Sequence, residues 1–237
     1  MGSCKDTAVT SVPGQQTWVV VPALNEASVI RHTITALREV FPNVVVVDDG
    51  SDDTTGEGAI SSGAVVIRHP LPLGQGAAIQ TGIRFSLDRG AAYVATFDAD
   101  GQHNAEDLQR MLRMLCREHC DIVLGSRFLG RAEGMTRARY LLIKAAAAFT
   151  NRTTGVSLTD AHNGLRIMTA TTAGRLRIVH DGMAHASAII AQIGRMKLKV
   201  REAPVTVTYS EYSTAKGQKM SNSFRILLEL FVGWLLR

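Results

Sequence analysis

Residues 91–103 read AAYVATFDADGQH, an apolar run that ends in two carboxylates, Asp98 and Asp100. A short apolar run bounded by turn residues is typical of a buried β-strand. Side chains on an extended chain alternate between faces, so we expect Asp98, Asp100 and Gln102 to point the same way. Two carboxylates and an amide oxygen form a hard oxygen site suited to Mg²⁺ or Mn²⁺. An isolated acidic pair at a strand end is more often simply solvated, so the rest of the chain must decide between these interpretations.

The same alternation of apolar runs and amphipathic segments continues on both sides of this stretch. Further strands are predicted at 18–21, 44–47, 64–67, 121–125 and 198–209, and helices at 29–40, 76–87 and after the capping residue Asn104. This pattern predicts an α/β fold with a mostly parallel, doubly wound sheet. Ligands of such sheets bind beyond the carboxyl ends of the strands. The polar pairs Asn25-Glu26, Asp48-Asp49, Asp98/Asp100 and Ser126-Arg127 all fall at that edge.

Composition limits the classes of protein and partner that fit this chain. A length of 237 residues with 46% hydrophobic residues is enough for one large α/β domain. The three cysteines provide no disulfide framework, and together with the lack of an apolar signal segment they predict a reducing, cytoplasmic compartment. The net charge of +5 is concentrated after Arg195 and around 127–144, which favours anionic partners. No nucleic-acid-binding motif is visible, so nucleic acid is not expected as a partner.

The polar loops carry a family resemblance when they are taken in order. The segments VVVPALNE (19–26), VVDDGSDDTT (46–55), LGQGAA (73–78) and DADGQH (98–103) resemble family-2 glycosyltransferases of the GT-A fold. GSRF (125–128) and DAHNGLR (160–166) are similar to the branch of dolichol-phosphate mannose synthases and bacterial polyprenyl-phosphate glycosyltransferases. The resemblance implies an N-terminal tail (1–16), a GT-A catalytic domain (17–210) and a C-terminal basic, amphipathic helix (211–237). Each motif alone is weak, and the ordered set is specific.

The resemblance implies an inverting hexosyltransferase that uses a nucleotide-diphospho-sugar donor with Mg²⁺ or Mn²⁺. The implied metal ligands are Asp98, Asp100 and Gln102, with Asp100 also counted as catalytic. The implied donor-binding residues are Pro22, Glu26, Asp49, Gly74, Gly76, Asp98, Arg127, Arg131 and Lys216. Asp49 matches the family position that contacts the nucleobase, whereas Asp48 is expected to hold its loop. Arg127 is the main candidate for a phosphate clamp, because a guanidinium grips phosphate oxygens in pairs.

Asp160 separates two possible acceptors. If the acceptor is a hydroxyl, a carboxylate must remove its proton, and Asp160 is the candidate base. If the acceptor is a polyprenyl phosphate, its oxygen is already anionic, and Asp160 would instead shape the acceptor loop. The basic clusters, which include Arg131, Arg137 and Arg139, favour the phosphate acceptor in cell-surface glycan assembly.

The last segment predicts how the chain meets a membrane. Residues 221–236 place apolar side chains on one face of a helix, with basic residues beside it. Such a helix fits peripheral contact with the cytoplasmic face of a membrane, contact with a membrane protein, or a homo-oligomer contact.

Two other functions are considered for the whole chain. A nucleotidyltransferase would need a Gly-rich, Arg-containing first loop, which PALNE (22–26) is not. A non-catalytic, membrane-peripheral binding protein would have no metal-dependent affinity for nucleotides.

Overall fold

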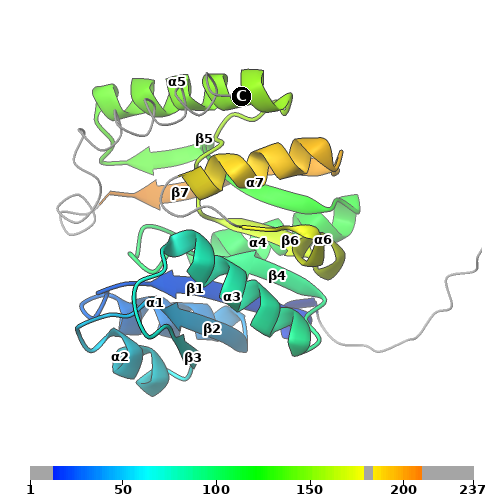
Figure 1. The fold of residues 1–237 in the computed structure, drawn as a ribbon. Coiled ribbons are helices and arrows are strands. Elements are labelled where there is room, and N and C mark those ends of the chain that lie inside the picture. The colour runs from blue at the N-terminus through cyan, green and yellow to red at the C-terminus, as the bar shows by residue number, and fades with distance from the viewer. Residues whose placement is uncertain (1–12, 179–183, 210–237) are drawn as a thin grey trace, which may run out of the picture.

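The computed structural model describes residues 13–178 and 184–209, and these residues form a sheet of seven strands in the order β3-β2-β1-β4-β6-β5-β7 (Figure 1). The strands are β1 (Thr17–Ala23), β2 (Asn43–Asp48), β3 (Val65–Arg68), β4 (Tyr93–Thr96), β5 (Ile122–Glu133), β6 (Arg166–Thr169) and β7 (Val200–Thr208). The helices are η1 (Pro13–Gln16), α1 (Ile30–Val40), α2 (Thr55–Ser61), α3 (Gln75–Asp88), α4 (Ala105–Glu118), α5 (Arg137–Thr154), α6 (Ala170–Arg175) and α7 (Ala184–Arg195).

Strand β1 lies inside the sheet and is covered on both faces. Val19 and Val21 pack into one apolar core, Val20 packs into the other, and all three are fully buried. Alternating side chains of a strand point to opposite faces, so an unbroken run of valines requires helices on both sides. The prediction of a doubly wound sheet is therefore confirmed.

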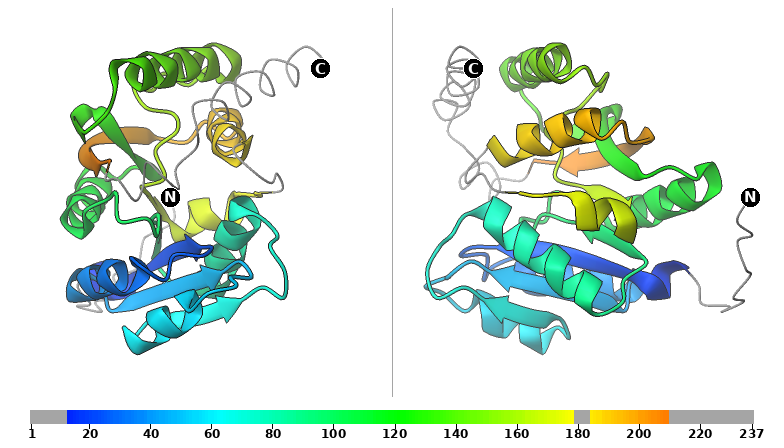
Figure 2. Two further views of the ribbon diagram at one scale, coloured as in Figure 1. Left: turned by 90° about the vertical axis from the view of Figure 1, so that its left-hand side faces the viewer. Right: turned by 45° about the vertical axis from the view of Figure 1, so that its right-hand side comes forward.

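Helices cover the two faces as separate layers (Figure 2). Helices α1 and α4 pack on one face, and α3, α6 and α7 pack on the other. Helix α3 lies very close to β1, because a Cβ built on Gly82 would stand 2.2 Å from a methyl carbon of Val20. This contact holds α3 against β1, and the first residues of α3 lie at the edge where the parallel strands end. Within the described ranges, no helix combines the length and the apolar character needed to cross a bilayer.

The sheet departs from the predicted pattern at three elements. Strand β6 runs antiparallel to both β4 and β5, and neither it nor α2 was predicted. Strand β3 was predicted as a buried strand, but it lies at the edge of the sheet, where Val65 is 39% exposed. Strand β5 continues past the predicted end at Gly125 to Glu133, with an irregularity between Ser126 and Arg131. The remaining strands pair in parallel, so their carboxyl ends meet at one edge.

Candidate functional site

A cavity of about 470 Å³ opens at the edge where the parallel strands end. Its walls come from the ends of β1, β2 and β4, from the start of α3, and from the loop before β6. The lining residues are Pro22, Ala23, Leu24, Glu26, Asp49, Pro72, Gly74, Gln75, Ala78, Asp98, Ala99, Asp100, His162, Gly164, Arg166 and Ala186. The cavity therefore brings together most of the polar segments that the sequence placed at this edge.

Asp98 and Asp100 both line the cavity, although the reason differs from the expected one. Strand β4 ends at Thr96, and residues 98–101 form a turn in which Gly101 has a positive φ of 73°. Ala99 between the two acids is only 4% exposed and packs into the core, which leaves both carboxylates on the cavity side. The expectation that the chain stays extended and points Gln102 the same way as the two acids was wrong. Gln102 does not line the cavity, and its main-chain N–H donates to Asp100 Oδ1 at 3.1 Å.

The two carboxylates make this end of the cavity strongly anionic. Burial raises the pKa of Asp100 to about 6, and the like charge of Asp98 adds to the rise. The Gln102 N–H and His103 oppose this increase, whereas Glu26 adds to it. Asp98 accepts a hydrogen bond from Gln75 Nε2 at 3.1 Å and lies 3.5 Å from His103 Nε2. A bound cation would relieve the repulsion between these acids.

The floor of the cavity fits tightly against Asp98. A Cβ built on Gly164 would stand 1.9 Å from Asp98 Oδ2, so any larger residue here would have to displace the Asp98 carboxylate. The Gly164 carbonyl accepts a hydrogen bond from Thr96 Oγ1 at 2.7 Å, which ties the loop to β4. Beside it, burial lowers the pKa of the Arg166 guanidinium, and Asp98 and Asp160 oppose that effect. The buried Arg166 guanidinium therefore interacts electrostatically with both acidic groups.

Asp49 and the start of α3 form another part of the cavity wall. Asp49 is 3% exposed and holds the 69–74 loop: Oδ1 accepts from Leu73 N at 2.9 Å and Oδ2 accepts from Gly74 N at 2.7 Å. Gly74 has a φ of 94°, which favours glycine, and it is the N-cap of α3 without a side-chain cap. The first N–H groups of α3 thus begin at the cavity wall, where they favour an anion.

Arg127 and Asp160 form a separate, nearly buried ion pair. Arg127 Nε donates to Asp160 Oδ2 at 2.6 Å, and Arg127 Nη1 donates to Tyr209 Oη at 2.5 Å. Burial disfavours the charged guanidinium, but Asp160 and Tyr209 outweigh it and raise the pKa of Arg127. The turn that carries Asp160 is held by Glu202, whose carboxylate accepts from the main-chain N–H of Thr159 and of Asp160. Neither Arg127 nor Asp160 lines the cavity.

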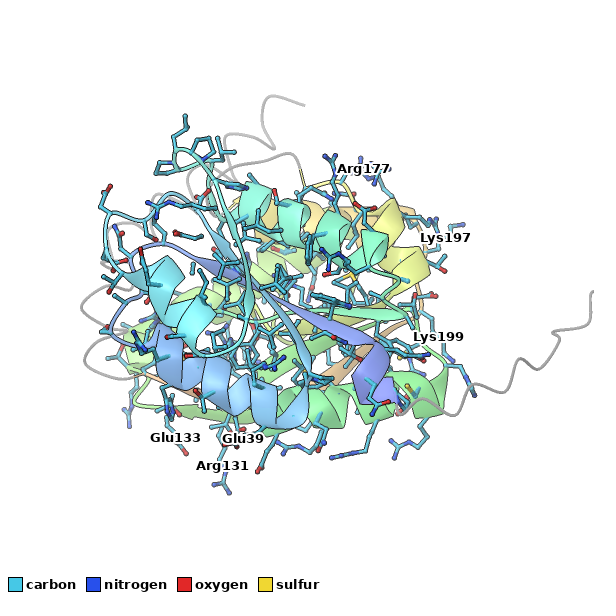
Figure 3. The ribbon with its side chains drawn as sticks, turned by 90° about the horizontal axis from the view of Figure 1, so that it is seen from below. Glu39, Arg131, Glu133, Arg177, Lys197 and Lys199 are labelled. Carbon is cyan, nitrogen blue, oxygen red and sulfur yellow. The ribbon has the colours of Figure 1, made fainter. Side chains whose placement is uncertain are left out.

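The structure brings some of the predicted residues together and separates others. Those that line the cavity are Pro22, Glu26, Asp49, Gly74, Asp98 and Asp100; those that do not are Gly76, Gln102, Arg127, Arg131 and Asp160. Gly76 is buried in the first turn of α3, and Arg131 is exposed on the outside of the molecule near Glu133 (Figure 3). Lys216 and the 211–237 helix lie outside the described residues.

Several lining residues were not singled out from the sequence. They are Gln75, His162, Gly164 and Arg166. Gly164 and Arg166 belong to the DAHNGLR motif. The motif was recognised, but its sequence did not indicate that these residues line the cavity. What was missing was the antiparallel strand β6, which brings this motif back beside β4.

The donor set fits a metal ion that is shared with a substrate. Among the described residues, no group of three or more His, Cys, Asp or Glu side chains is placed to hold a metal ion. Magnesium is commonly bound by one or two carboxylates, with substrate phosphates and water completing its coordination. The mutually repelling Asp98 and Asp100 match that smaller ligand set.

Comparisons with known proteins agree with this architecture. The family described as Glycosyl transferase family 2 matches residues 18–182. An uncharacterized protein of Methanocaldococcus jannaschii is 33% identical over 96% of this chain and 96% of its own length. The UDP-N-acetylglucosamine–dolichyl-phosphate N-acetylglucosaminyltransferase of Methanococcus voltae is 26% identical over 91% of this chain and 94% of its own. The similarity thus includes a relative named for transfer to a lipid phosphate.

Solved structures share the fold. The glucosyl-3-phosphoglycerate synthase of Mycobacterium tuberculosis, in complex with Mn²⁺, uridine-diphosphate-glucose and phosphoglyceric acid, superposes with a TM-score of 0.68. The superposition covers 93% of this chain and 79% of the synthase at 18% identity. This likeness establishes the GT-A fold, as the sequence predicted.

Proposed function

The chain belongs to glycosyl transferase family 2, and from that premise we propose that it moves a sugar from a nucleoside diphosphate to a polyprenyl phosphate, with inversion at the sugar. The observation that supports a nucleotide-sugar donor is the cavity itself. Its lining includes an acidic pair, Asp98 and Asp100, and a second group made of Asp49 with the apolar Leu24 and Pro72. A nucleoside diphosphate has the same division, with a charged diphosphate at one end and a planar base at the other.

Asp98 and Asp100 would hold a divalent ion, Mg²⁺ or Mn²⁺, together with the diphosphate. When bound, this ion supplies positive charge against the negative charge that builds on the leaving diphosphate. The first turn of α3 supports the same end of the donor, because its N–H groups and helix dipole favour phosphate. Gly74, with no side chain, lets the diphosphate approach the backbone. Glu26 is at the nucleoside end of the donor in this proposal.

The ion pair between Arg127 and Asp160 supports the phosphate acceptor over the hydroxyl acceptor. Asp160 is 1% exposed, and it accepts from Arg127 Nε and from the main-chain N–H of Arg127 and His162. A carboxylate that is paired with a guanidinium and lies outside the cavity is not placed to take a proton from a bound hydroxyl. A phosphate oxygen needs no base. Arg131 and Arg137 are exposed basic residues, and in this proposal they provide positive charge for such an acceptor.

The acceptor is tested by supplying both kinds of molecule to the purified chain. With Mn²⁺ and a panel of nucleotide sugars, we expect transfer to undecaprenyl phosphate and none to undecaprenol or to free sugars, measured by mass spectrometry of the lipid product. Asp160→Asn, which keeps the shape of the side chain, should retain transfer to the phosphate. Complete loss of activity in Asp160→Asn, with the fold intact, would instead support a hydroxyl acceptor and Asp160 as its base.

The same panel tests the non-catalytic alternative. A binding protein on this fold would show no Mn²⁺-dependent thermal shift with any nucleoside diphosphate.

Because the proposed acceptor is a membrane lipid, we also propose that the chain works at the cytoplasmic membrane surface. Lys216 and the 211–237 helix are the candidate contacts, which flotation with anionic vesicles would test.

A further inference from the structure

His69, which belongs to none of the expected motifs, is a hydrogen-bond partner of Asp49. His69 Nδ1 lies 2.7 Å from Asp49 Oδ1, and His69 Nε2 lies 3.0 Å from Thr81 Oγ1. Both the His69 and the Asp49 side chains are nearly buried, at 7% and 4% exposed. Since a carboxylate only accepts, His69 must donate from Nδ1, and in the neutral ring Nε2 then accepts from the Thr81 hydroxyl. The imidazole is therefore fixed at both nitrogen atoms.

This arrangement leaves the two oxygen atoms of Asp49 unequal. Each carboxylate oxygen has two lone pairs that accept hydrogen bonds. Oδ1 accepts from His69 Nδ1 and from Leu73 N, so both of its lone pairs are used. Among the described residues, Oδ2 accepts only from Gly74 N, so one lone pair remains. Asp49 can thus receive a single further N–H donor.

The position of Asp49 in the cavity indicates which donor that is. The start of α3 separates it from the metal-binding acids, because Gly74 N donates to Asp49 while Gln75 Nε2 donates to Asp98. Leu24, which is 40% exposed, and Pro72 line the cavity with Asp49. Apolar walls around one acceptor suit a flat ring that presents an N–H at its edge.

We propose that His69 determines the base of the donor, by occupying one oxygen of Asp49 so that the remaining acceptor selects uracil or thymine over guanine. This inference depends on the proposed function, in which the cavity binds a nucleoside diphosphate. Uracil and thymine carry one ring N–H, at N3, which a single lone pair satisfies. Guanine presents N1–H and the N2 amine side by side and needs both oxygens of a carboxylate. Cytosine presents a lone pair at N3, which Asp49 repels.

The base preference is measured directly on the intact chain. Titration calorimetry with Mn²⁺ and UDP, dTDP, GDP or CDP should show binding of UDP and dTDP, and at least about tenfold weaker binding of GDP and CDP, because an unpaired buried donor or acceptor is costly. Binding of GDP as tight as that of UDP would overturn the role of His69 while leaving the proposed function standing. Failure of all four nucleotides to bind would overturn the proposed function itself.

Two variants of His69 test its effect on the base preference. His69→Ala frees a lone pair on Asp49 Oδ1, so the UDP-to-GDP ratio of affinities should fall to within about threefold. His69→Asn retains the preference for UDP, because its Nδ2 amide stands where the imidazole Nδ1 stood and still donates to Asp49. Circular dichroism confirms that each variant is folded. Equal loss of UDP and GDP affinity in both variants, with their ratio unchanged, would reduce His69 to a structural role and refute the inference.

Discussion

The two acidic sites at this edge of the sheet are built in opposite ways. Asp100 stands beside another carboxylate, and burial together with Asp98 raises its pKa to about 6. Asp160 is buried more deeply, at 1% exposed, but Arg127 neutralises it and main-chain N–H groups surround it. The repulsion between Asp98 and Asp100 is unfavourable until a cation binds. The charge of Asp160 is already neutralised within the protein. The partner of a carboxylate, more than its position after a strand, therefore indicates whether the carboxylate serves the ligand or the fold.

Neutralising the repelled acid should give the largest effect on function. In Asp100→Asn we expect transferase activity to fall by about 10³-fold, because positive charge at a leaving group is among the largest contributions to catalysis. Activity is measured as turnover with Mn²⁺ and the preferred nucleotide sugar. The melting temperature should stay the same or rise, because one of two repelling charges is removed. Asp88→Asn, an exposed change at the far end of α3, serves as the control.

Breaking the neutralised pair should damage the fold instead. Arg127→Met leaves Asp160 buried without its cation, and we expect the free energy of unfolding to fall by about 3–5 kcal/mol, measured by urea denaturation. Adding Asp160→Asn to this variant removes the stranded charge and should recover part of that loss. If Arg127→Met has the same free energy of unfolding as the unchanged chain but loses transfer to lipid phosphate, Arg127 is a phosphate clamp. The ion pair of Arg127 with Asp160 would then serve the ligand and not the fold.

The tight fit of Gly164 against Asp98 should give a smaller effect. A methyl group at Gly164 must displace the Asp98 carboxylate, so Gly164→Ala should lower kcat/KM by about 10²-fold, the typical result of a 1 Å displacement in an active site. Gly174→Ala is the matched control, because a Cβ there meets only Leu87 Cδ1 at an ordinary 3.8 Å. Equal activity of the two variants would show that the position of Asp98 does not matter for the reaction.

The parallel half of the sheet was predictable because its signals are local. The valines of β1 and the acids of 98–100 lie within single short segments, and the parallel pattern alone places their ends together. Strand β6 was not predictable in this way. Its four residues are short, and their pairing with β4 joins segments about 70 residues apart. The ion pair of Arg127 with Asp160 depends on the same return of the chain, so the sequence suggested Arg127 as a free clamp.

The loops at the edge of the sheet also contain side-chain contacts that the sequence alone could not predict. The sequence assigned the nucleobase to Asp49 and the support of the loop to Asp48, whereas in the structure both acids accept main-chain hydrogen bonds from their loops. The contact between His69 and Asp49 joins the ends of β2 and β3. Nothing in the local pattern of either strand indicates that pair, because it depends on their register.

Lowering the pH should give the smallest effect, with opposite signs for binding and for stability. Because Asp100 must lose its proton to bind a metal, the Kd for Mn²⁺ with nucleotide should rise by about tenfold per pH unit below 6 and level off above about 7. The folded chain binds this proton more tightly than the unfolded chain, so in the absence of metal Asp100 contributes more to stability as the pH falls from 7 toward 4. Calorimetry at several pH values, with and without Mn²⁺, separates the two trends. A decline in nucleotide affinity that is equally steep without metal would assign the titration to another group and remove the distinction between the two acidic sites on which these predictions depend.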